Sequence, residues 1–258
     1  MKIHLVDAFA SSAFSGNPAG ICVHDSWLAD DLMQNIAMEL NQAETAFVVP
    51  EGTRFGLRWF TPNVEVDLCG HATLAAAHIL WETGVVSASQ SIEFLSRSGT
   101  LTCTNLTDGI ELDFPSEAPK AVSAPSGMFG AATQWFQNRM DWLVPLANEE
   151  DLMEYVPDLA AIASIGMRGL IITAPATRSD ADFVSRFFAP QCAVAEDHVT
   201  GSAHCALAPF WQERLQKNPL IGYQASGRGG FVGVKVVGER VKLWGRAVTT
   251  LSGDLRVS

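Results

Sequence analysis

The sequence predicts an α+β protein made of two homologous, barrel-like halves, each a curled and mostly antiparallel sheet around a central helix. Three observations lead to this expectation. Short β-prone runs separated by turns fill most of the chain, two alanine-rich helical segments interrupt them, and several segments recur in the same order half a chain length apart. The chain has 258 residues, 48% of them hydrophobic, which is enough for one large domain or two small ones with their own cores.

An internal repeat organises the chain. The stretch RWFTP at 58–62 recurs as RFFAP at 186–190, a shift of 128 positions. The glycines that open the two alanine-rich segments, Gly70 and Gly201, lie 131 positions apart. Because a shared order at almost one offset is hard to obtain by chance, the chain is interpreted as two copies of one unit.

The end of each copy sets the expected domain boundary. The alternating strands GIELDF (109–114) and ERVKLW (239–244) keep nearly the same shift. Between the copies, the stretch 115–127 is rich in Pro, Ser and Ala, as linkers are. We therefore expect domains over 1–118 and 119–258, with the last strand a candidate to return to the first domain.

The alanine-rich helices predict where a ligand would bind. A helix that is apolar on nearly every face must be surrounded, and alanine lets strands approach it closely. The start of such a helix leaves four N–H groups without helical partners and carries partial positive charge. Gly70 and Gly201 allow a ligand to approach the backbone there. If the two halves face each other, both helix starts point into one cleft, which suits a carboxylate.

Composition excludes several classes of function. The 17 Lys+Arg against 28 Asp+Glu leave a net charge of −11, which argues against nucleic acid or an anionic membrane surface as the main partner. No apolar run approaches the ~18 residues of a membrane helix, and the amino terminus does not resemble a signal peptide. The five cysteines contain no C-x-x-C pair, no metal motif is recognisable, and no dinucleotide fingerprint follows a strand. We expect a cytoplasmic protein without metal or cofactor.

Polar groups near the helix starts are candidates for chemistry, and each also has a structural explanation. Glu44 opens an apolar β run, as either a strand-edge carboxylate or a catalytic base. Asp197 and Ser202 stand where ordinary helix caps stand. Cys69 is most simply a small buried hydrophobe. The histidines within the two helices, His78 and His204, are expected to pack in the core.

Five blocks of the chain are DAFASSAFSGNPAGICV (7–23), AETAFV (43–48), RWFTPNVEVDLCGHATLAAA (58–77), RFFAPQCAVAEDHVTGSAHCALAPFW (186–211) and QASGRGG (224–230). These blocks resemble the signature blocks of the phenazine-biosynthesis PhzF-like family. That family shares the fold of diaminopimelate epimerase. The blocks follow the family's order across essentially the whole chain. The resemblance implies two domains related by pseudo-twofold symmetry, with the active site between them.

The resemblance also implies roles for single residues. It assigns the acid/base carboxylate to Glu44 and the substrate-contacting histidine to His71. The family's aspartate and serine fall on Asp197 and Ser202. The implied reaction is a cofactor-free isomerisation, in which a proton leaves one carbon of a small carboxylic acid and returns to another carbon of the same molecule.

Further expectations concern binding and assembly. The resemblance aligns Gly70 and Gly201 with glycines whose backbone amides face the ligand. The expected partner is therefore a small carboxylate. The family resemblance, together with seven tryptophans, favours a homodimer.

A departure from the epimerase branch of this fold bears on mechanism. Epimerases of this fold use two facing thiols, one at each helix start. Here Cys69 occupies the first place, whereas the second place aligns with His198 and the nearest thiol is Cys205. A single carboxylate shuttle therefore fits better than a thiol pair. Two alternatives stay open: a racemase or epimerase that uses Glu44 or Cys69 with another base, and a non-catalytic small-molecule binding protein of the same fold.

Overall fold

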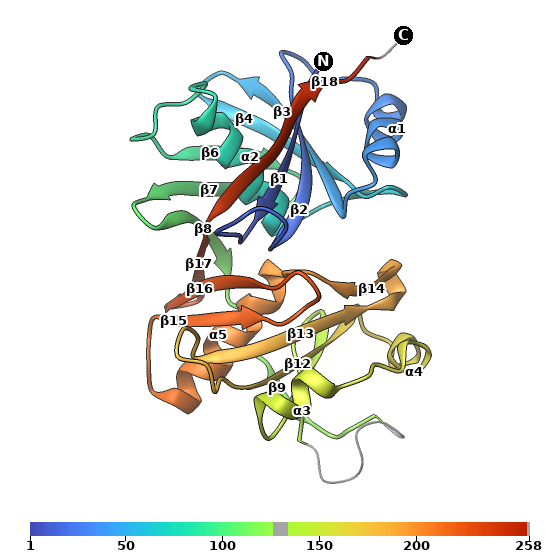
Figure 1. Cartoon of the computed structure of the whole chain (residues 1–258), viewed down its shortest axis with the longest axis vertical. Helices are drawn as coiled ribbons and strands as arrows, with labels where there is room; N and C mark the ends of the chain where they lie inside the picture. Colours follow the sequence, from blue (N-terminus) through green and yellow to red (C-terminus); the bar gives the residue numbers. More distant parts are fainter. Residues whose placement is uncertain (126–133, 257–258) are drawn as a thin grey trace. The chain divides into compact units, whose positions relative to one another are not determined.

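The computed structural model describes residues 1–125 and 134–256, and it confirms the α+β fold class (Figure 1). The chain divides into two compact units. Unit 1 comprises Met1–Asp113 and Trp244–Ser258, and unit 2 comprises Phe114–Leu243. The last strand, β18 (Ala247–Asp254), pairs along its length with the first strand, β1 (Lys2–Ala8), so the end of the chain belongs to unit 1.

Unit 1 is a curled sheet around helix α2 (Gly70–Glu82). In the sheet the strands follow the order β18–β1–β2–β3–β4–β6–β7–β8, and β5 pairs with the end of β4. Neighbours run antiparallel except at β2–β3 and β4–β6. The further strands are β2 (Asn17–Val23), β3 (Glu44–Glu51), β4 (Arg54–Phe60), β5 (Glu65–Val66), β6 (Ile92–Ser96), β7 (Gly99–Leu106) and β8 (Gly109–Pro115).

Unit 2 repeats this order around helix α5 (Gly201–Leu215). The sequence β9–β10–β11–β12–β13–β15–β16–β17 has its parallel pairs at β11–β12 and β13–β15, and β14 pairs with the end of β13. These strands are β9 (Lys120–Val122), β10 (Trp135–Gln137), β11 (Asp141–Pro145), β12 (Gly169–Pro175), β13 (Phe183–Ala189), β14 (Val194–Asp197), β15 (Leu220–Gln224), β16 (Gly230–Val237) and β17 (Arg240–Gly245).

The stretch expected to link the copies is partly structured. Residues 120–122 form β9, which pairs with β10 in the way that β18 pairs with β1. Residues 126 and 127 of the expected linker lie outside the described residues. The stretch therefore contributes an edge strand to unit 2 as well as a connection.

The two central helices are buried, and most of their buried side chains are small. In α2 the side chains of Ala72, Leu74, Ala75, Ala76 and Ala77 are all at 0% exposure. The helix packs against β1, β2, β3 and β18, while α5 packs against β15 and β16. A helix surrounded in this way needs short side chains, because each residue contacts a strand or the core.

Peripheral helices complete each unit. Helix α1 (Asp30–Leu40) covers a cluster in unit 1 that includes Met33, Ile36, Phe47 and Phe60. In unit 2, α3 (Glu149–Glu154) and α4 (Leu159–Ser164) cover a cluster with Trp135, Leu152, Ile162 and Phe188, and a short 3-10 turn, η1 (Pro190–Cys192), precedes β14. None of the described helices has the length and apolar character that crossing a membrane requires.

Candidate functional site

The two central helices begin where the sequence predicts, at Gly70 and Gly201. Their N-cap residues, Cys69 and Thr200, have extended backbones with φ of −145° and −112°, and neither side chain caps its own helix. The first N–H groups of both helices are therefore not satisfied by an N-cap side chain, which leaves the positive end of each helix available to an anion.

In each helix, a side chain four residues after the N-cap contacts the carbonyl oxygen of the N-cap residue. The Thr73 hydroxyl donates to the carbonyl oxygen of Cys69, and His204 Nδ1 lies 2.8 Å from the carbonyl oxygen of Thr200. Thr73 and His204 both lie four residues after the N-cap, so they are equivalent positions of the repeat. The same equivalence pairs Cys69 with Thr200.

Glu44 and His71 meet in unit 1. Glu44 is the first residue of β3, which runs parallel to β2, and His71 is the second residue of α2. Glu44 Oε2 lies 3.2 Å from His71 Nε2, with side-chain exposures of 20% and 6%. The two atoms are not aligned as a hydrogen bond, and the buried Nε2 has no hydrogen-bond partner among the described residues. This nitrogen therefore faces the Glu44 carboxylate and keeps a donor position that a ligand can use.

Asn17 determines which imidazole nitrogen carries the proton. Its side-chain amide nitrogen lies 3.3 Å from His71 Nδ1, and an amide nitrogen can only donate. When the imidazole is neutral, Nδ1 must therefore accept, and the hydrogen must be on Nε2, facing Glu44. Asn17 is fully buried at the start of β2. The sequence analysis did not single it out, although a polar residue that opens an apolar strand was a usable signal.

Glu44, Cys69 and His71 are also the set of potential metal ligands that the described residues bring together, with one atom from each within 4.8 Å of the others. Zinc accepts such oxygen, sulfur and nitrogen donors. However, Cys69 Sγ lies 3.5 Å from Nδ1 of His71 whereas Glu44 faces Nε2. One ion binds only one of these nitrogens, so the geometry suits a hydrogen-bonded chain better than a chelate.

Asp197 is held at the start of α5 in unit 2. The Thr200 hydroxyl donates to Asp197 Oδ2 over 2.6 Å. Gln224 is fully buried and links both residues, because its Nε2 donates to the carbonyl oxygen of Asp197 and its Oε1 accepts from the Thr200 N–H, each over 2.8 Å. Thr200 thus holds the carboxylate itself, and Gln224 holds the backbone of the same residue. Sequence reasoning missed Gln224, because no pattern connects it to a helix start 24 positions earlier.

Ser202 and His204 occupy different environments on α5. Ser202 is half-buried and second in its helix, the position that His71 occupies in α2. His204 is fully buried, and this burial lowers its pKa to about 4. It is therefore neutral near pH 7 and braces the helix, as the sequence analysis expected of a packing residue. Burial likewise raises the pKa of the Cys205 thiol to about 12, so Cys205 cannot serve as a second thiolate base near neutral pH.

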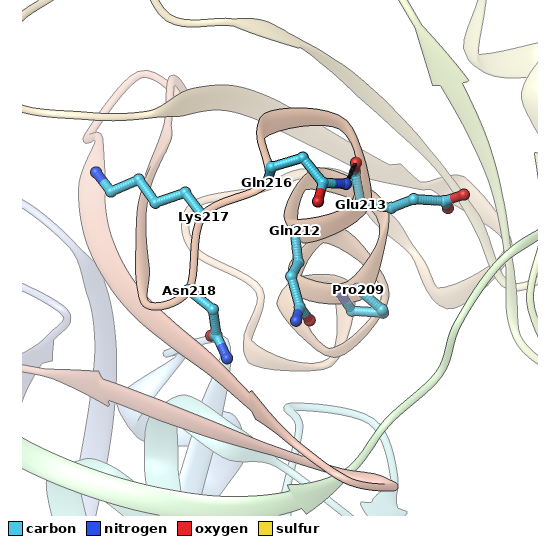
Figure 2. A pocket seen from close by; sticks show the side chains of 6 residues that line it. All are labelled: Pro209, Gln212, Glu213, Gln216, Lys217 and Asn218. Atoms are coloured by element: carbon cyan, nitrogen blue, oxygen red, sulfur yellow. Dashed lines mark hydrogen bonds between the residues drawn. The ribbon is translucent and has the colours of Figure 1, made fainter.

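A cavity of about 320 Å³ lies elsewhere, at the end of α5, and includes none of these groups. Figure 2 shows the charged ends of Glu213 and Lys217 pointing away from each other. The cavity is lined by Pro209, Gln212, Glu213, Gln216, Lys217 and Asn218. Because these side chains do not converge on one point, the chemistry is better placed at the helix starts.

A family model for phenazine biosynthesis-like proteins matches residues 6–253, almost the whole described chain. The chain belongs to the phenazine biosynthesis-like family. Among curated members, it is 48% identical to an uncharacterized isomerase of Halalkalibacterium halodurans, over 98% of this chain and 97% of that protein. It is 46% identical to an uncharacterized isomerase of Pseudomonas aeruginosa, over 100% of this chain and 99% of that protein.

Solved structures agree with the family and extend the fold likeness. A phenazine biosynthesis family protein of Enterococcus faecalis superposes with a TM-score of 0.93 at 40% identity, covering 99% of both chains. More distant likeness concerns the fold alone. A hydroxyproline epimerase of Agrobacterium vitis with bound trans-4-hydroxy-L-proline has a TM-score of 0.64 at 11% identity, with 98% and 91% of the chains covered. A methylitaconate-delta-isomerase has a TM-score of 0.56 at 12% identity, with 98% and 95% covered.

Proposed function

We propose that this phenazine biosynthesis-like protein is a cofactor-independent isomerase of a small carboxylic acid, with Glu44 as the group that moves the proton. One observation carries the proposal: the buried Nε2 of His71 lies 3.2 Å from Glu44 and has no hydrogen-bond partner among the described residues. Leaving a buried donor unsatisfied costs about 1–3 kcal/mol. That cost is explained if a substrate atom accepts from this nitrogen.

In the proposed reaction, a Glu44 carboxylate oxygen takes the proton from a carbon of the substrate, and the electron pair of that C–H bond moves into the adjacent unsaturated system. His71 Nε2–H donates to the atom on which negative charge develops. The protonated Glu44 then returns the proton to a different carbon of the same molecule. Atoms and electrons balance without an external reactant. Because the Glu44 side chain is only 20% exposed, exchange of its proton with water is slowed, which favours return of the same proton.

In unit 2, Asp197 and the groups at the start of α5 are proposed to bind the substrate. Asp197 is oriented by Thr200 and Gln224 and would accept a hydrogen bond from the substrate. The helix-start amides at Gly70 and Gly201, together with Ser202, are proposed as carboxylate-binding groups, because helix starts attract anions.

The comparisons support the class of substrate. Two curated relatives are named isomerases, and the names of distant fold neighbours mention trans-4-hydroxy-L-proline and methylitaconate. Both compounds are small carboxylic acids. A carboxylate bound at a helix start is therefore a reasonable common feature for this chain as well.

The test is proton movement in deuterated water. The protein is incubated with a panel of cyclic and unsaturated carboxylic acids that includes these two, and isomer formation and C–H exchange are followed by NMR and mass spectrometry. We call an acid of the panel that is isomerised the responding acid. Glu44→Gln keeps the shape of the side chain but removes the base, so turnover of the responding acid should fall by about 10²–10⁴-fold while binding persists. Glu39→Gln, at an exposed glutamate of α1, is the matched control and should keep full activity.

Two outcomes would change the conclusion. Full activity of Glu44→Gln would show that another group moves the proton. Binding of carboxylates without isomerisation or C–H exchange would favour the non-catalytic binding protein. Asp197→Asn should reduce turnover less than Glu44→Gln, because an amide can still orient the substrate.

An epimerase remains the second candidate, and one contact favours it. Cys69 Sγ lies 3.5 Å from His71 Nδ1, so a thiol and a carboxylate flank the same imidazole. In an epimerase, Glu44 or Cys69 would remove the proton and another base on the opposite face of the substrate would return it.

A further inference from the structure

The two units contain the same ion pair at equivalent places. In unit 1, Arg58 Nε and Nη2 donate to the two carboxylate oxygens of Glu65 over 2.7 and 2.8 Å. In unit 2, Arg186 donates to Glu196 in the same two-pronged manner over 2.7 and 3.0 Å. Glu65 and Glu196 each stand five positions before the glycine that opens the central helix. We call these pairs the unit 1 clamp and the unit 2 clamp.

Both clamps are mostly buried and share their surroundings. The side-chain exposures are 18% and 13% for Arg58 and Glu65, and 12% and 25% for Arg186 and Glu196. Each guanidinium lies over the phenylalanine two residues further along its own strand, at 5.2 Å from Phe60 and 5.0 Å from Phe188. A planar two-pronged pair of this kind has a defined geometry, unlike an exposed lysine pair.

Each arginine also holds a second element. Arg58 Nη1 donates to Asp30 Oδ1 of α1 over 2.8 Å. Arg186 Nη1 donates to the carbonyl oxygens of Leu152 and Tyr155 at the end of α3, over 3.1 and 2.7 Å. The clamps therefore tie the segment before each helix start to the strand behind it and to a peripheral helix.

The clamped segments are short and have few other contacts of this kind: Arg97 also pairs with Glu65 over 2.7 Å, and Thr200 and Gln224 hold Asp197. Strand β5 has two residues, and β14 has four, with an irregular register against β13. In a strand, neighbouring side chains point to opposite faces. When Arg186 holds Glu196 on one face of β14, the Asp197 side chain points to the opposite face. There the Thr200 hydroxyl donates a hydrogen bond to it.

We propose that Arg186 and Arg58 are positioning residues for the helix-start groups: Arg186 orients Asp197 through Glu196, and Arg58 orients the segment that leads to His71 through Glu65. The proposal rests on the proposed function for its catalytic consequence. Neither arginine needs to touch the substrate.

A double-mutant cycle tests the unit 2 clamp with the acid that responds in the isomerisation assay. Arg186→Met should lower kcat/KM by about 10- to 100-fold, since misplacement of a catalytic group by 1 Å can cost about 10²-fold. Arg186→Lys keeps the charge but not the fork and should lose less. In an Asp197→Asn background, Arg186→Met should have less than about threefold further effect, because both changes disable the same group.

Additive losses in the cycle would overturn the proposal, because Arg186 would then act independently of Asp197. Arg139→Lys is the matched control, since Arg139 is 70% exposed and pairs with Glu117 in the same unit. It should leave kcat/KM unchanged. The unit 1 clamp is tested in the same way, with Arg58→Lys alone and combined with His71→Asn.

A measurement without substrate separates failure of the clamp from failure of the proposed function. The Thr200 N–H is bonded to Gln224, so its hydrogen exchange reports the order of the helix start. Arg186→Lys is used because it is a milder change than Arg186→Met and serves even if Arg186→Met does not fold. It should accelerate hydrogen exchange at the Thr200 amide by about 10-fold or more relative to the amides of the β15–β16 ladder. Unchanged relative exchange at Thr200 would refute the clamp even if no acid is turned over.

Discussion

Asn17 donates its side-chain amide to Nδ1 of His71 over 3.3 Å, across 54 positions of sequence. This contact keeps the imidazole hydrogen on Nε2, the nitrogen that faces Glu44. An imidazole held in the other tautomer could not donate from Nε2 to developing charge. The contact therefore connects a buried residue with no acid/base chemistry of its own to the proposed reaction.

Substitution Asn17→Asp should place a hydrogen on Nδ1 of His71, because a carboxylate accepts a hydrogen bond from it. Where that hydrogen comes from Nε2, Nε2 can no longer donate. Removing one such donor costs about 10²–10³-fold in kcat. The ¹⁵N shifts of His71 report the tautomer without any substrate, and kcat is measured with the responding acid. Asn105→Asp, at an exposed asparagine bonded to the carbonyl oxygen of Ala88, is the control. A His71 that keeps its tautomer would contradict the assignment.

Substitution Cys69→Ser should preserve activity within about threefold if Glu44 alone moves the proton. Cys69 is the N-cap of α2, and serine caps helices well, so we expect equal or slightly higher stability. The repeat supports the substitution, because Thr200 holds the equivalent place in unit 2. Turnover and the urea midpoint are the measurements. A loss of about 10²-fold or more with stability retained would make the thiol part of the proton path and favour the epimerase.

Acid should destabilise the fold through His204. Burial lowers the pKa of this histidine from 6.5 to about 4, so the unfolded chain takes up a proton at higher pH than the folded chain does. Its contribution is therefore complete above pH 6.5 and is lost as the pH falls toward 4, by about 3 kcal/mol in total. Urea unfolding between pH 7.5 and about 4.5 should show this decline.

The matched variant for this pH effect is His204→Thr, which copies Thr73 of unit 1. It should be less stable than the wild type near pH 7, because a buried ring is removed, yet lose stability more slowly as the pH falls. Burial also lowers the pKa of His4 and His78, which remain in both proteins, so the comparison isolates His204. Parallel pH curves for the two proteins would contradict the assignment.

Assembly can be tested directly. Most of the large aromatic residues are buried, yet several apolar side chains remain exposed, including Phe14 at 80% and Val156 at 84%. Burying such surface against a second copy would release water from it. We expect sedimentation at micromolar concentration to show a species of twice the 27.8 kDa chain mass. A monomer throughout that range would remove the expectation.

The sequence by itself determined the local features of this protein. Each helix start follows from a glycine at the boundary between a polar turn and a run of small apolar residues, so Gly70 and Gly201 could be placed from neighbours within one or two turns. The repeat could be found because two copies of one unit keep similar residues at a nearly constant offset. The fold class then followed, since a surrounded alanine-rich helix requires a sheet that curls around it.

Only the tertiary structure decided which side chains meet. Asn17 reaches His71 because β2 packs against α2, and Gln224 reaches Thr200 because β15 packs against α5. Strand order and register of this kind depend on contacts between residues tens of positions apart. No local pattern specifies such pairs, because a hydrogen bond needs two groups within about 3 Å whereas the sequence constrains only which face each group occupies.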